Sequence, residues 1–595
     1  MKKRKTVILI FLTLILTIIA FLPSFENGFT NWDDNELVTS NTIIMDLSWH
    51  NIKTIFTTFY LSAYIPLTIL SYSLEYHFFK LDPRAYHTTN IVLHLFNCLL
   101  VFWLIYKLSS NIYISFVTTI LFAIHPLRVE SVAWITGRKD VLYSFLFLGA
   151  LLSYLYYRGK QVIKYYWLSL FLFILSVLAK GMAVTFPFVL LLCDYLFHRK
   201  FNKYLLLEKI PFFVIALVFG VIAILGERSF EDITTTSSFI FFDKVLIVSY
   251  GLLFYLTKIA VPVKLSCYYP YPEKIGGFLP PIFFFSFIII VGLIIAVILT
   301  KKYTRKVIFG SLFFLIAILP YLQLIRAGQL IANRYIYIPS IGLFYMVGTG
   351  FFWLYTRKLR SVNVLKSVLG IIFIGIVGVL SFITFNQCRI WKDSMTLWNN
   401  VLDKYPNVPV AYNNRGTVYY DKGEYDKAVT EFTLALKYNP NYVRAYYNLG
   451  ITYDAKGEYD RAIIELNKAL MVNPKYAAAY NNRGLIYGRV GEYDKAIADL
   501  TKALKINPKY AEAYCNRGIT YGRIEKYDRA IVDFTEALRN DHKYAEAYYN
   551  RAIAYFLIKE YEKAWQDVRK SEGLGYPVDP NFLELLIETS KGQHR

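Results

Sequence analysis

Two consecutive carboxylates, Asp33 and Asp34, follow the first apolar stretch of the chain in the segment Asn-Trp-Asp-Asp-Asn. An apolar run from Thr6 to Leu22 precedes them, and basic residues 2–5 stand at its head. Basic residues that flank a span remain in the cytoplasm, so the carboxylates emerge on the far side, at the membrane surface. Ionised carboxylates beside hydrocarbon are costly and commonly functional, and a carboxylate can accept a proton during a reaction. The pair is the first candidate for chemistry, and the alternative is an ordinary polar loop.

Membrane-spanning helices must position this pair, because the composition is that of a membrane protein. Hydrophobic residues form 56% of the 595 residues, aromatic residues form 18%, and mean hydropathy is +0.37. A soluble chain of this length does not have such a composition. Runs of about 20 apolar residues cross a bilayer. We predict about eleven such spans, near residues 6–25, 87–107, 111–125, 140–157, 164–178, 182–197, 209–226, 281–300, 307–324, 339–356 and 366–385.

The basic residues support this topology. Residues 1–390 carry an excess of 19 positive charges and the remainder an excess of 3. The positive charge gathers in short loops at 158–160, 198–200, 301–306 and 357–360, all cytoplasmic if the run 241–260 is a re-entrant or interfacial element. Such loops fix topology and contact anionic lipid, and they do not indicate nucleic-acid binding. Five scattered cysteines show neither metal-site spacing nor a disulfide framework.

The predicted topology brings acidic, basic and aromatic groups to one membrane face. The charged and histidine residues expected there are Asp33, Asp34, His125, Arg128, Glu130, Arg138, Lys139, Asp140, Lys180, Arg326 and Arg334. Two amphipathic stretches, around 47–59 and 65–79, suit helices that lie along the interface on the same face. The convergence indicates a site. The alternative is that these charges pair among themselves or anchor the ends of spans.

The C-terminal part consists of repeats. The segment Ala411–Gly416 recurs every 34 residues, beginning again at Ala445, Ala479, Ala513 and Ala547. This is the tetratricopeptide (TPR) period, in which each repeat is a pair of helices. Residues 391–406 supply half a repeat with Trp398 facing inward, and a helix near 580–590 caps the stack. The predicted fold is all-α: a polytopic membrane domain of residues 1–390 and an α-solenoid of residues 391–595.

One asparagine recurs at the same position in the first helix of every repeat. These residues are Asn414, Asn448, Asn482, Asn516 and Asn550. They are expected to form a ladder along the concave groove, and this resembles the asparagine ladder of the soluble O-GlcNAc transferase, which holds peptide backbone. An amide offers donors and an acceptor, so it can hold an extended backbone without reading its sequence. The alternative is a packing role within the repeat.

Several motifs of the membrane part resemble those of one enzyme family. Trp32-Asp33-Asp34 resembles the first-loop acidic motif of glycosyltransferases of the GT-C fold that use a polyprenyl-phosphate sugar. The segments at 64–68, 86–90 with His94, 125–133, 137–140 and 332–340 resemble the tetratricopeptide-containing transmembrane O-mannosyltransferases. Two residues depart from that pattern: Ile65 stands where the family usually has arginine, and Asn333 where an acidic residue usually precedes Arg334.

The resemblance implies residue roles. Asp33 would accept the proton of the attacking hydroxyl, and Asp34 would orient Asp33 or hold the acceptor. Arg138 and Arg334 would bind the departing phosphate, because the guanidinium fork pairs two oxygens at once. His87, His94, His125 and Glu130 would line the pocket. The implied activity is an inverting transfer of a sugar from a polyprenyl phosphate to Ser/Thr hydroxyls of proteins, with mannose as the first candidate for the sugar.

The expected substrates and setting follow from this activity. The donor is a substrate rather than a cofactor, and no residue pattern assigns a divalent metal. Expected partners are membrane lipids, the donor lipid, and protein or peptide acceptors held in the repeat groove. The expected location is a bacterial inner membrane, with undecaprenyl phosphate as the donor lipid and the repeats outside the cytoplasm. Two alternatives remain: transfer to lipid or glycan acceptors, and a non-catalytic membrane-anchored scaffold.

Overall fold

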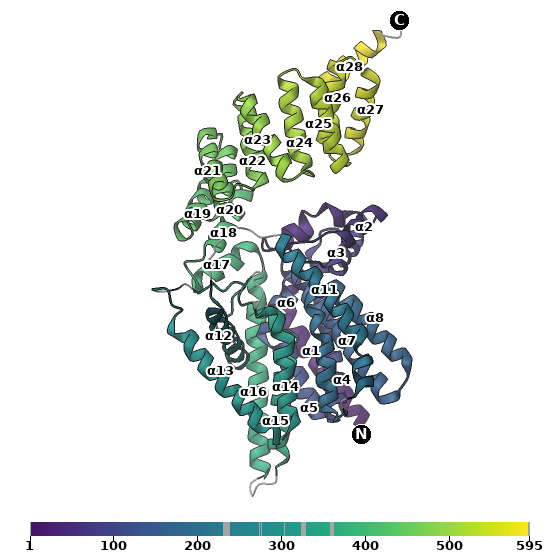
Figure 1. Cartoon of the computed structure of the whole chain (residues 1–595), viewed down its shortest axis with the longest axis vertical. Helices are drawn as coiled ribbons and strands as arrows, with labels where there is room; N and C mark the ends of the chain where they lie inside the picture. The colour runs from purple at the N-terminus through teal and green to yellow at the C-terminus, as the bar shows by residue number, and fades with distance from the viewer. Residues whose placement is uncertain are drawn as a thin grey trace. The chain divides into compact units, whose positions relative to one another are not determined.

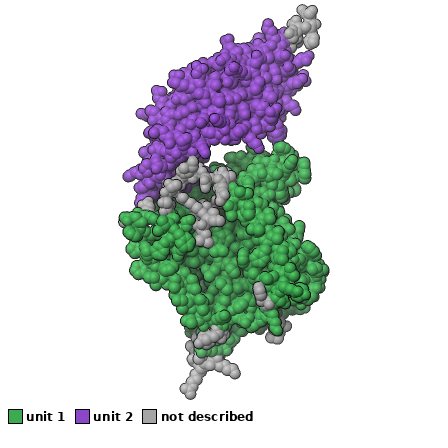
Figure 2. Space-filling view, in the orientation of Figure 1, with its two compact units in different colours: residues 1–406 green, residues 407–595 purple. Residues whose placement is uncertain are grey.

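The chain folds into two compact units, Met1–Pro406 and Asn407–Arg595 (Figures 1 and 2). The computed structural model describes residues 2–592 except 201, 230–238, 273, 275, 303, 323–328 and 358–361. Within this described part every regular element is helical, and one isolated bridge joins Tyr60 to Ala63. The expected all-α fold is confirmed. Arg326, Tyr303, Lys358, Leu359 and Arg360, and the last two residues of the expected span 307–324, lie outside the described residues.

Unit 1 begins with a long apolar helix and continues through helices joined by short turns. Its first part contains α1 (Lys2–Phe21), η1 (Leu22–Glu26), η2 (Asn35–Thr39), η3 (Thr42–Met45), α2 (Trp49–Thr57), α3 (Pro66–Phe79), α4 (Pro83–Ser109), α5 (Ile112–Ile124), η4 (Pro126–Arg128), α6 (Val129–Ala133), η5 (Ile135–Gly137) and α7 (Arg138–Lys160). Its second part contains α8 (Ile163–Ala179), η6 (Gly181–Thr185), α9 (Phe186–Leu196), α10 (Lys203–Leu207), α11 (Ile210–Ser229), α12 (Phe241–Ala260), α13 (Pro281–Leu299), η7 (Thr300–Lys302), α14 (Arg305–Ile318), η8 (Leu319–Tyr321), η9 (Asn333–Ile336), α15 (Ser340–Thr356), α16 (Val362–Cys388), η10 (Arg389–Trp391) and α17 (Ser394–Lys404).

Several of these helices can cross a membrane. Among the described residues, five are long and apolar enough: Lys3–Glu26, Pro83–Ser109, Ile135–Lys160, Pro281–Leu299 and Lys366–Trp391. A sixth arises if α5 and the following η4–α6 segment, bent by 58°, act as one span. Three further apolar helices are shorter, Ile163–Ala179, Gly181–Leu196 and Ile210–Gly226. The protein is therefore a membrane protein, and the expected number of eleven spans stays a prediction.

Glycines let three of the helices approach closely. A Cβ on Gly310 of α14 would lie 2.5 Å from the carbonyl oxygen of Gly342 on α15. On the same helix α15, a Cβ on Gly348 would lie 2.7 Å from the hydroxyl of Thr118 on α5. Small residues at such crossings are the common way for membrane helices to gain packing contacts, because lipid supplies little hydrophobic drive between them. The glycines thus hold α15 between α14 and α5.

Unit 2 is a stack of helix pairs with the register expected from the 34-residue spacing. The pairs are α18 (Pro409–Asp421) with α19 (Tyr425–Tyr438), α20 (Val443–Ala455) with α21 (Tyr459–Val472), α22 (Ala477–Arg489) with α23 (Tyr493–Ile506), α24 (Ala511–Arg523) with α25 (Tyr527–Asn540), and α26 (Ala545–Leu557) with α27 (Tyr561–Gly573); α28 (Pro580–Gly592) follows. The first helices carry Gly416, Gly450, Gly484 and Gly518 at their crossings. Added Cβ atoms there would lie 2.6 to 2.8 Å from Phe432, Leu466, Leu500 and Phe534 of the paired second helices.

An arginine follows the asparagine position in four of the five repeats and joins the two helices of its pair. Arg517, for example, donates from Nε and Nη2 to the Asp533 carboxylate at 2.7 and 2.8 Å, and its Nη1 donates to Thr501 Oγ1 of the preceding repeat at 3.0 Å. The second repeat has Leu449 here, and its carboxylate Glu465 pairs with Lys468 instead. A two-pronged guanidinium–carboxylate pair fixes angle as well as distance, so it sets the geometry of each repeat.

The boundary between the units differs from the one expected at residue 390. Residues 391–406, which the sequence assigned to the solenoid, form part of unit 1, with α17 among them. Trp398 faces inward as expected and is fully buried. Residues 391–406 keep the 34-residue register, since Trp398 and Pro406 correspond to Phe432 and Pro440, and α17 ends 34 residues before α19 does. The inward face of α17 nevertheless packs on the membrane part of the chain through Trp398.

Candidate functional site

The acidic pair lies in the loop between η1 and η2, and its two members have different surroundings. Asp34 is buried: it accepts hydrogen bonds from Thr30 N at 2.8 Å, Thr30 Oγ1 at 2.9 Å and Thr136 N at 3.1 Å. Burial raises the pKa of Asp34 to about 6, although these hydrogen bonds act in the opposite direction. Asp34 therefore ties the loop to the turn before α7.

Asp33 faces outward and belongs to a second cluster. Its Oδ2 accepts from Lys139 Nζ at 3.1 Å, and 24% of its side chain is exposed. The Lys139 ammonium lies 5.1 Å from the centre of the Trp134 ring, and the Arg334 guanidinium lies 5.4 Å from the same centre. Cations are attracted to the face of an indole, so Trp134 gathers both around Asp33. We call Asp33, Trp134, Lys139 and Arg334 the Asp33 cluster.

Glu130 pairs with Arg334 of this cluster and with the backbone beside it. The Arg334 guanidinium donates to Glu130 Oε1, and also to Gln329 Oε1 at 3.1 Å. Glu130 Oε2 accepts from the backbone N–H of Asn333 at 2.9 Å. The Asn333 side chain accepts from the Tyr269 hydroxyl at 2.9 Å and donates to Ser266 O at 2.8 Å. Asn333 thus joins the late loop to the segment before α13, and Glu130 orients Arg334.

Arg138 begins α7, immediately before Lys139, and is fully buried. Its Nη2 donates to Glu75 Oε1 and to Tyr86 O, each at 2.9 Å, and its Nε donates to Asn90 Oδ1. Glu75 lies on α3 and Asn90 on α4, so Arg138 joins the start of α7 to both helices. The Arg138 guanidinium thus has partners on α3 and α4, and its expected role at the donor phosphate stays a prediction.

The three histidines expected in a pocket are also buried. His94 contacts the Tyr337 hydroxyl through Nδ1 at 2.6 Å and Ala123 O through Nε2 at 2.9 Å. His125 contacts Ile259 O at 3.0 Å and accepts from Leu127 N at 3.3 Å. His87 lies within α4. The contacts of His94 and His125 join elements distant in sequence, which is the packing role that a lone histidine commonly has.

Helix α17 closes over the acidic loop. The Trp398 indole N–H donates to Asn31 Oδ1 at 2.6 Å, and the Asn31 N–H donates to Ser394 Oγ at 2.9 Å. The Trp398 and Trp32 rings meet edge to face, with centroids 5.1 Å apart. Trp391 stacks on Trp134 with centroids 5.4 Å apart. Helix α17 and the turn before it therefore position both the loop and the indole of the Asp33 cluster.

A third cation approaches this region. Lys180 follows α8, and its Nζ lies 2.5 Å from Asp140 Oδ1. Burial lowers the pKa of Lys180 to about 8, although Asp140 acts in the opposite direction. Lys139 and Arg334 also lower this pKa, so the three cations share one electrostatic environment. The sequence analysis assigned Lys139 and Lys180 to the same predicted face as Asp33 but gave them no role; the adjacency of Lys139 to Arg138 was the available signal.

The asparagines of unit 2 form hydrogen bonds between repeats. Asn448 donates to Asn413 Oδ1 at 2.9 Å, Asn482 to the Tyr447 hydroxyl at 2.7 Å, and Asn516 to Asn481 Oδ1 at 3.0 Å. In the first repeat Asn414 accepts from Asn413 at 3.1 Å. In the last, where the preceding repeat offers Cys515, Asn550 donates to Glu546 O at 3.0 Å. The side chains thus form a ladder that joins successive repeats, and their role in binding stays a prediction.

No metal-binding group stands out in the part of the chain that the structure describes. Within it, no three histidine, cysteine or carboxylate side chains converge as ligands would. All five cysteines are unpaired thiols and buried. The Asp33 cluster therefore offers carboxylate, ammonium, guanidinium and indole groups. This set can accept a proton and bind an anion.

Two family models match the repeats. The tetratricopeptide repeat model matches residues 477–510 and 511–544, and the TPR repeat model matches 416–455 and 452–491. Among solved structures, MamA is 28% identical, with 27% of this chain and 93% of that chain covered and a TM-score of 0.25. YrrB, described as a TPR protein with an unusual peptide-binding site, is 21% identical, with 33% and 97% covered and a TM-score of 0.27.

Relatives of the whole chain carry the name Protein O-mannosyl-transferase. TMTC3 of Homo sapiens is 24% identical over 412 residues, which cover 63% of this chain and 44% of that protein. F38B6.6 of Caenorhabditis elegans is 25% identical over 449 residues, which cover 71% and 61%. The chain thus spans about half the length of these relatives. It is a membrane protein with tetratricopeptide repeats that is similar, over 63% to 71% of its length, to proteins named O-mannosyltransferases.

Proposed function

We propose that this protein transfers a sugar from a polyprenyl phosphate to Ser/Thr hydroxyls of proteins, and mannose is the first candidate for that sugar. The observation that carries the proposal is the Asp33 cluster. It places an accessible carboxylate beside two cations, at the end of the first membrane helix, in a chain similar to O-mannosyltransferases. A lipid-linked sugar must react at the membrane surface, where a base and an anion-binding group are both required.

The reaction is a single displacement that inverts the anomeric centre. The acceptor hydroxyl oxygen forms a bond to the anomeric carbon, and the bond from that carbon to the phosphate oxygen breaks. Asp33 takes the hydroxyl proton, and the electron pair of the broken bond leaves with the phosphate. Arg334 and Lys139 hold the departing phosphate, because both are cationic and face Asp33 around Trp134. Each must exchange its present carboxylate partner for the phosphate.

Asp34 and Arg138 act by positioning. Both carboxylate oxygens of Asp34 accept hydrogen bonds, from Thr30 and from Thr136. These bonds hold the loop that carries Asp33. Arg138 joins α7 to α3 and α4, which fixes the helix start that carries Lys139. We therefore assign phosphate binding to Arg334 and Lys139 in preference to Arg138.

The repeats supply the acceptor in this proposal. Five stacked helix pairs form a continuous surface, and such arrays commonly bind extended peptides. The proposed location is an extracytoplasmic membrane face with the repeats outside the cytoplasm. An accepting protein would be held in unit 2 while its hydroxyl reacts near Asp33.

One observation favours a second function. Every charged side chain of the Asp33 cluster already has a partner within the chain, because Lys139 pairs with Asp33 and Arg334 with Glu130. A membrane-anchored scaffold that assembles other proteins on its repeats needs no further site. Sugar transfer distinguishes the two functions.

The test is transfer of radiolabelled sugar from polyprenyl phosphate to a Ser/Thr-bearing protein by the purified chain in detergent. Asp33→Asn keeps the shape of the side chain but removes the base, so turnover should fall by roughly 10²- to 10⁴-fold. The matched control is Asp403→Asn, an exposed carboxylate of α17, which should react at the wild-type rate. Wild-type turnover by Asp33→Asn excludes Asp33 as the base. No transfer by the wild-type chain across a panel of sugar donors favours the scaffold.

A further inference from the structure

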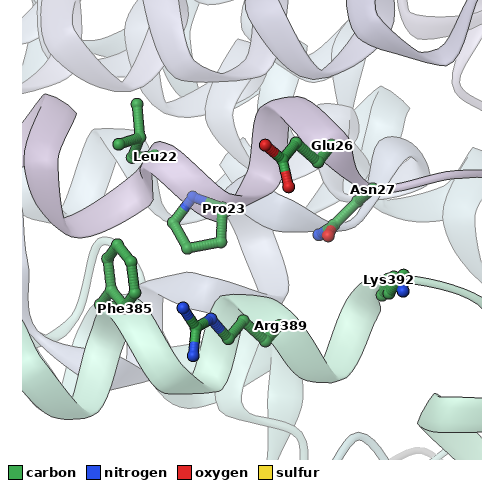
Figure 3. Close-up of a pocket in the computed structure, with 7 residues that line it drawn as sticks. All are labelled: Leu22, Pro23, Glu26, Asn27, Phe385, Arg389 and Lys392. Atoms are coloured by element: carbon green, nitrogen blue, oxygen red, sulfur yellow. The ribbon is translucent and has the colours of Figure 1, made fainter.

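A cavity of about 360 Å³ lies between the ends of the first and last long helices of unit 1 (Figure 3). Leu22, Pro23 and Glu26 of η1 form one wall, and Phe385 of α16 with Arg389 and Lys392 forms the other. The Asp33 cluster does not line it. The cavity is therefore a separate site in the same membrane-surface region.

The walls of the cavity are held by backbone contacts. The Asn27 amide donates to Cys388 O at 3.0 Å, and Gly28 N donates to Lys392 O at 2.8 Å. The Cys388 thiol lies 3.8 Å from Ala20 O, at the last turn of α1. These bonds join η1 and the residue after it to the end of α16 and the turn that follows, so they hold the two walls of the cavity together.

The charge of the cavity suits a single negative charge. Arg389 and Lys392 are cationic and Glu26 is anionic, which leaves a net charge of one positive. Among the described residues, neither cation forms an ion pair, and the Arg389 guanidinium lies 4.8 Å from the centre of the Phe385 ring. In Figure 3 the Arg389 side chain extends from its helix toward Pro23. The cavity thus offers cations that are available to an outside anion.

The surfaces beneath the cavity are apolar and face lipid. Ile19 lies about one helical turn before Leu22, and its side chain is 52% exposed. Phe382 lies about one turn before Phe385, and its side chain is 69% exposed. Only 22% of the apolar window of α1 and 11% of that of α16 is buried inside the protein. A molecule with a charged headgroup and acyl chains would fit this region. Its headgroup would lie in the cavity, and its acyl chains would lie along the exposed apolar faces of α1 and α16.

We propose that this cavity binds the phosphodiester headgroup of an anionic diacyl phospholipid. One phosphodiester carries one negative charge, which matches the net charge of the site, and its two chains would cover the exposed faces of α1 and α16. A bound lipid would join η1 to α16 beside the loop that carries Asp33. The proposal does not depend on sugar transfer.

The test is native mass spectrometry of the full chain in detergent, titrated with phosphatidylglycerol or with phosphatidylcholine of the same acyl chains. The wild-type chain should retain phosphatidylglycerol more strongly. Arg389→Gln and Lys392→Gln should each weaken its retention by about fivefold, the usual worth of one cation near an anionic lipid. Glu26→Gln removes the opposing charge and should strengthen retention, an effect that loss of folding cannot produce.

The matched control is Arg357→Gln. Arg357 also follows a long helix, α15, is exposed, and stacks on an aromatic ring, 4.5 Å from the centre of Trp353, but it lies outside the cavity. Its loss should leave phosphatidylglycerol retention unchanged. Equal retention of the two phospholipids, or retention unaffected by Arg389→Gln and Lys392→Gln, would overturn the proposal. Stronger Arg389-dependent retention of undecaprenyl phosphate, or full competition by inorganic phosphate, would overturn the assignment to a diacyl lipid.

Discussion

Neighbouring carboxylates can have opposite roles when one is buried and the other is not. Asp34 is 1% exposed and accepts three hydrogen bonds, whereas Asp33 faces a lysine at the surface of the site. A proton acceptor must be reachable by substrate, and a loop anchor must not move. In the proposed reaction, the pair divides these two requirements between consecutive residues.

The burial of Asp34 should make the thermal stability of the folded protein depend on pH. Its pKa is raised to about 6 in the folded state from 3.8, so folding favours the protonated carboxyl. This contribution is fully present below pH 3.8 and is lost as the pH rises through about 6. About two pKa units correspond to roughly 3 kcal/mol at most. The wild-type midpoint of thermal unfolding in detergent should therefore show a component that falls between about pH 4 and pH 7.

Asp34→Asn supplies the comparison for this measurement. The variant cannot titrate, so the component between pH 4 and pH 7 should vanish. Its amide has one acceptor for three donors, so it should also be less stable by about 1 to 3 kcal/mol at low pH, the cost of a buried unpaired donor. A wild-type profile that rises over this range, or one that the variant reproduces, contradicts the burial argument.

The sequence identified these residues as candidates but could not show what each of them contacts. The acidic pair was recognisable because it follows a span, and Arg138 and Arg334 because they lie in motifs. The burial of Asp34 depends on Thr136, which lies 102 residues away, and the engagement of Arg138 depends on Glu75 on another helix. Such long-range contacts leave no local pattern, so the sequence could not show that Lys139 pairs with Asp33 or that Arg138 pairs with Glu75.

At the scale of elements, the asparagine ladder joins successive repeats, and its predicted role in binding acceptor peptide can be tested. Replacing Asn448, Asn482 and Asn516 with alanine removes three hydrogen bonds between repeats, at about 1 kcal/mol each. We expect a folded array that binds acceptor peptide more weakly, measured by fluorescence anisotropy. The control changes Lys437, Met471 and Lys505 to alanine, which are exposed and also spaced by 34 residues. Unchanged peptide affinity in the asparagine variant would leave the ladder with a packing role alone.

The turns between paired helices carry a second prediction. Gly423, Gly457 and Gly491 have positive φ angles of 73°, 76° and 85°, whereas the equivalent Glu525 and Lys559 are held at 60° and 68°. A side chain in this left-handed region costs about 1 kcal/mol. Glu525→Gly should therefore slow amide hydrogen exchange in α24 and α25 of the full chain. Glu525→Ala keeps the strain and should not; equal protection in both variants would show that the turn is unstrained.

The repeat elements were predictable because their period is local. The 34-residue spacing gave the helix pairs, and the asparagine-proline steps gave their ends; α19, for example, ends at Tyr438, just before Asn439 and Pro440. The membrane helices were less predictable, because hydropathy does not show where an apolar run is interrupted. The run around α5 bends by 58° before α6. Glu130 and Arg128 both follow that break.

For the molecule as a whole, the topology can be tested through its thiols. All five native cysteines are buried, so they give little background to a membrane-impermeant maleimide. The ends of α1 and α16 meet at the Ala20–Cys388 contact, and α17, the last helix of unit 1, packs on the loop that carries Asp33. Met471 is 81% exposed in unit 2. Met471→Cys should label in intact cells, whereas Arg357→Cys should label only after lysis. The opposite pattern contradicts the proposed location of the repeats.

The position of α17 has a consequence for how the protein can vary. The helix that covers the Asp33 loop belongs to unit 1, and the repeats begin only after Pro406. Gene duplication or deletion of whole 34-residue units beyond that point leaves every contact of the loop in place. The number of repeats can therefore change in evolution while α17 and the Asp33 cluster stay the same. A crossover within residues 391–406 would instead remove Trp391 or Trp398, and such recombinants should be selected against.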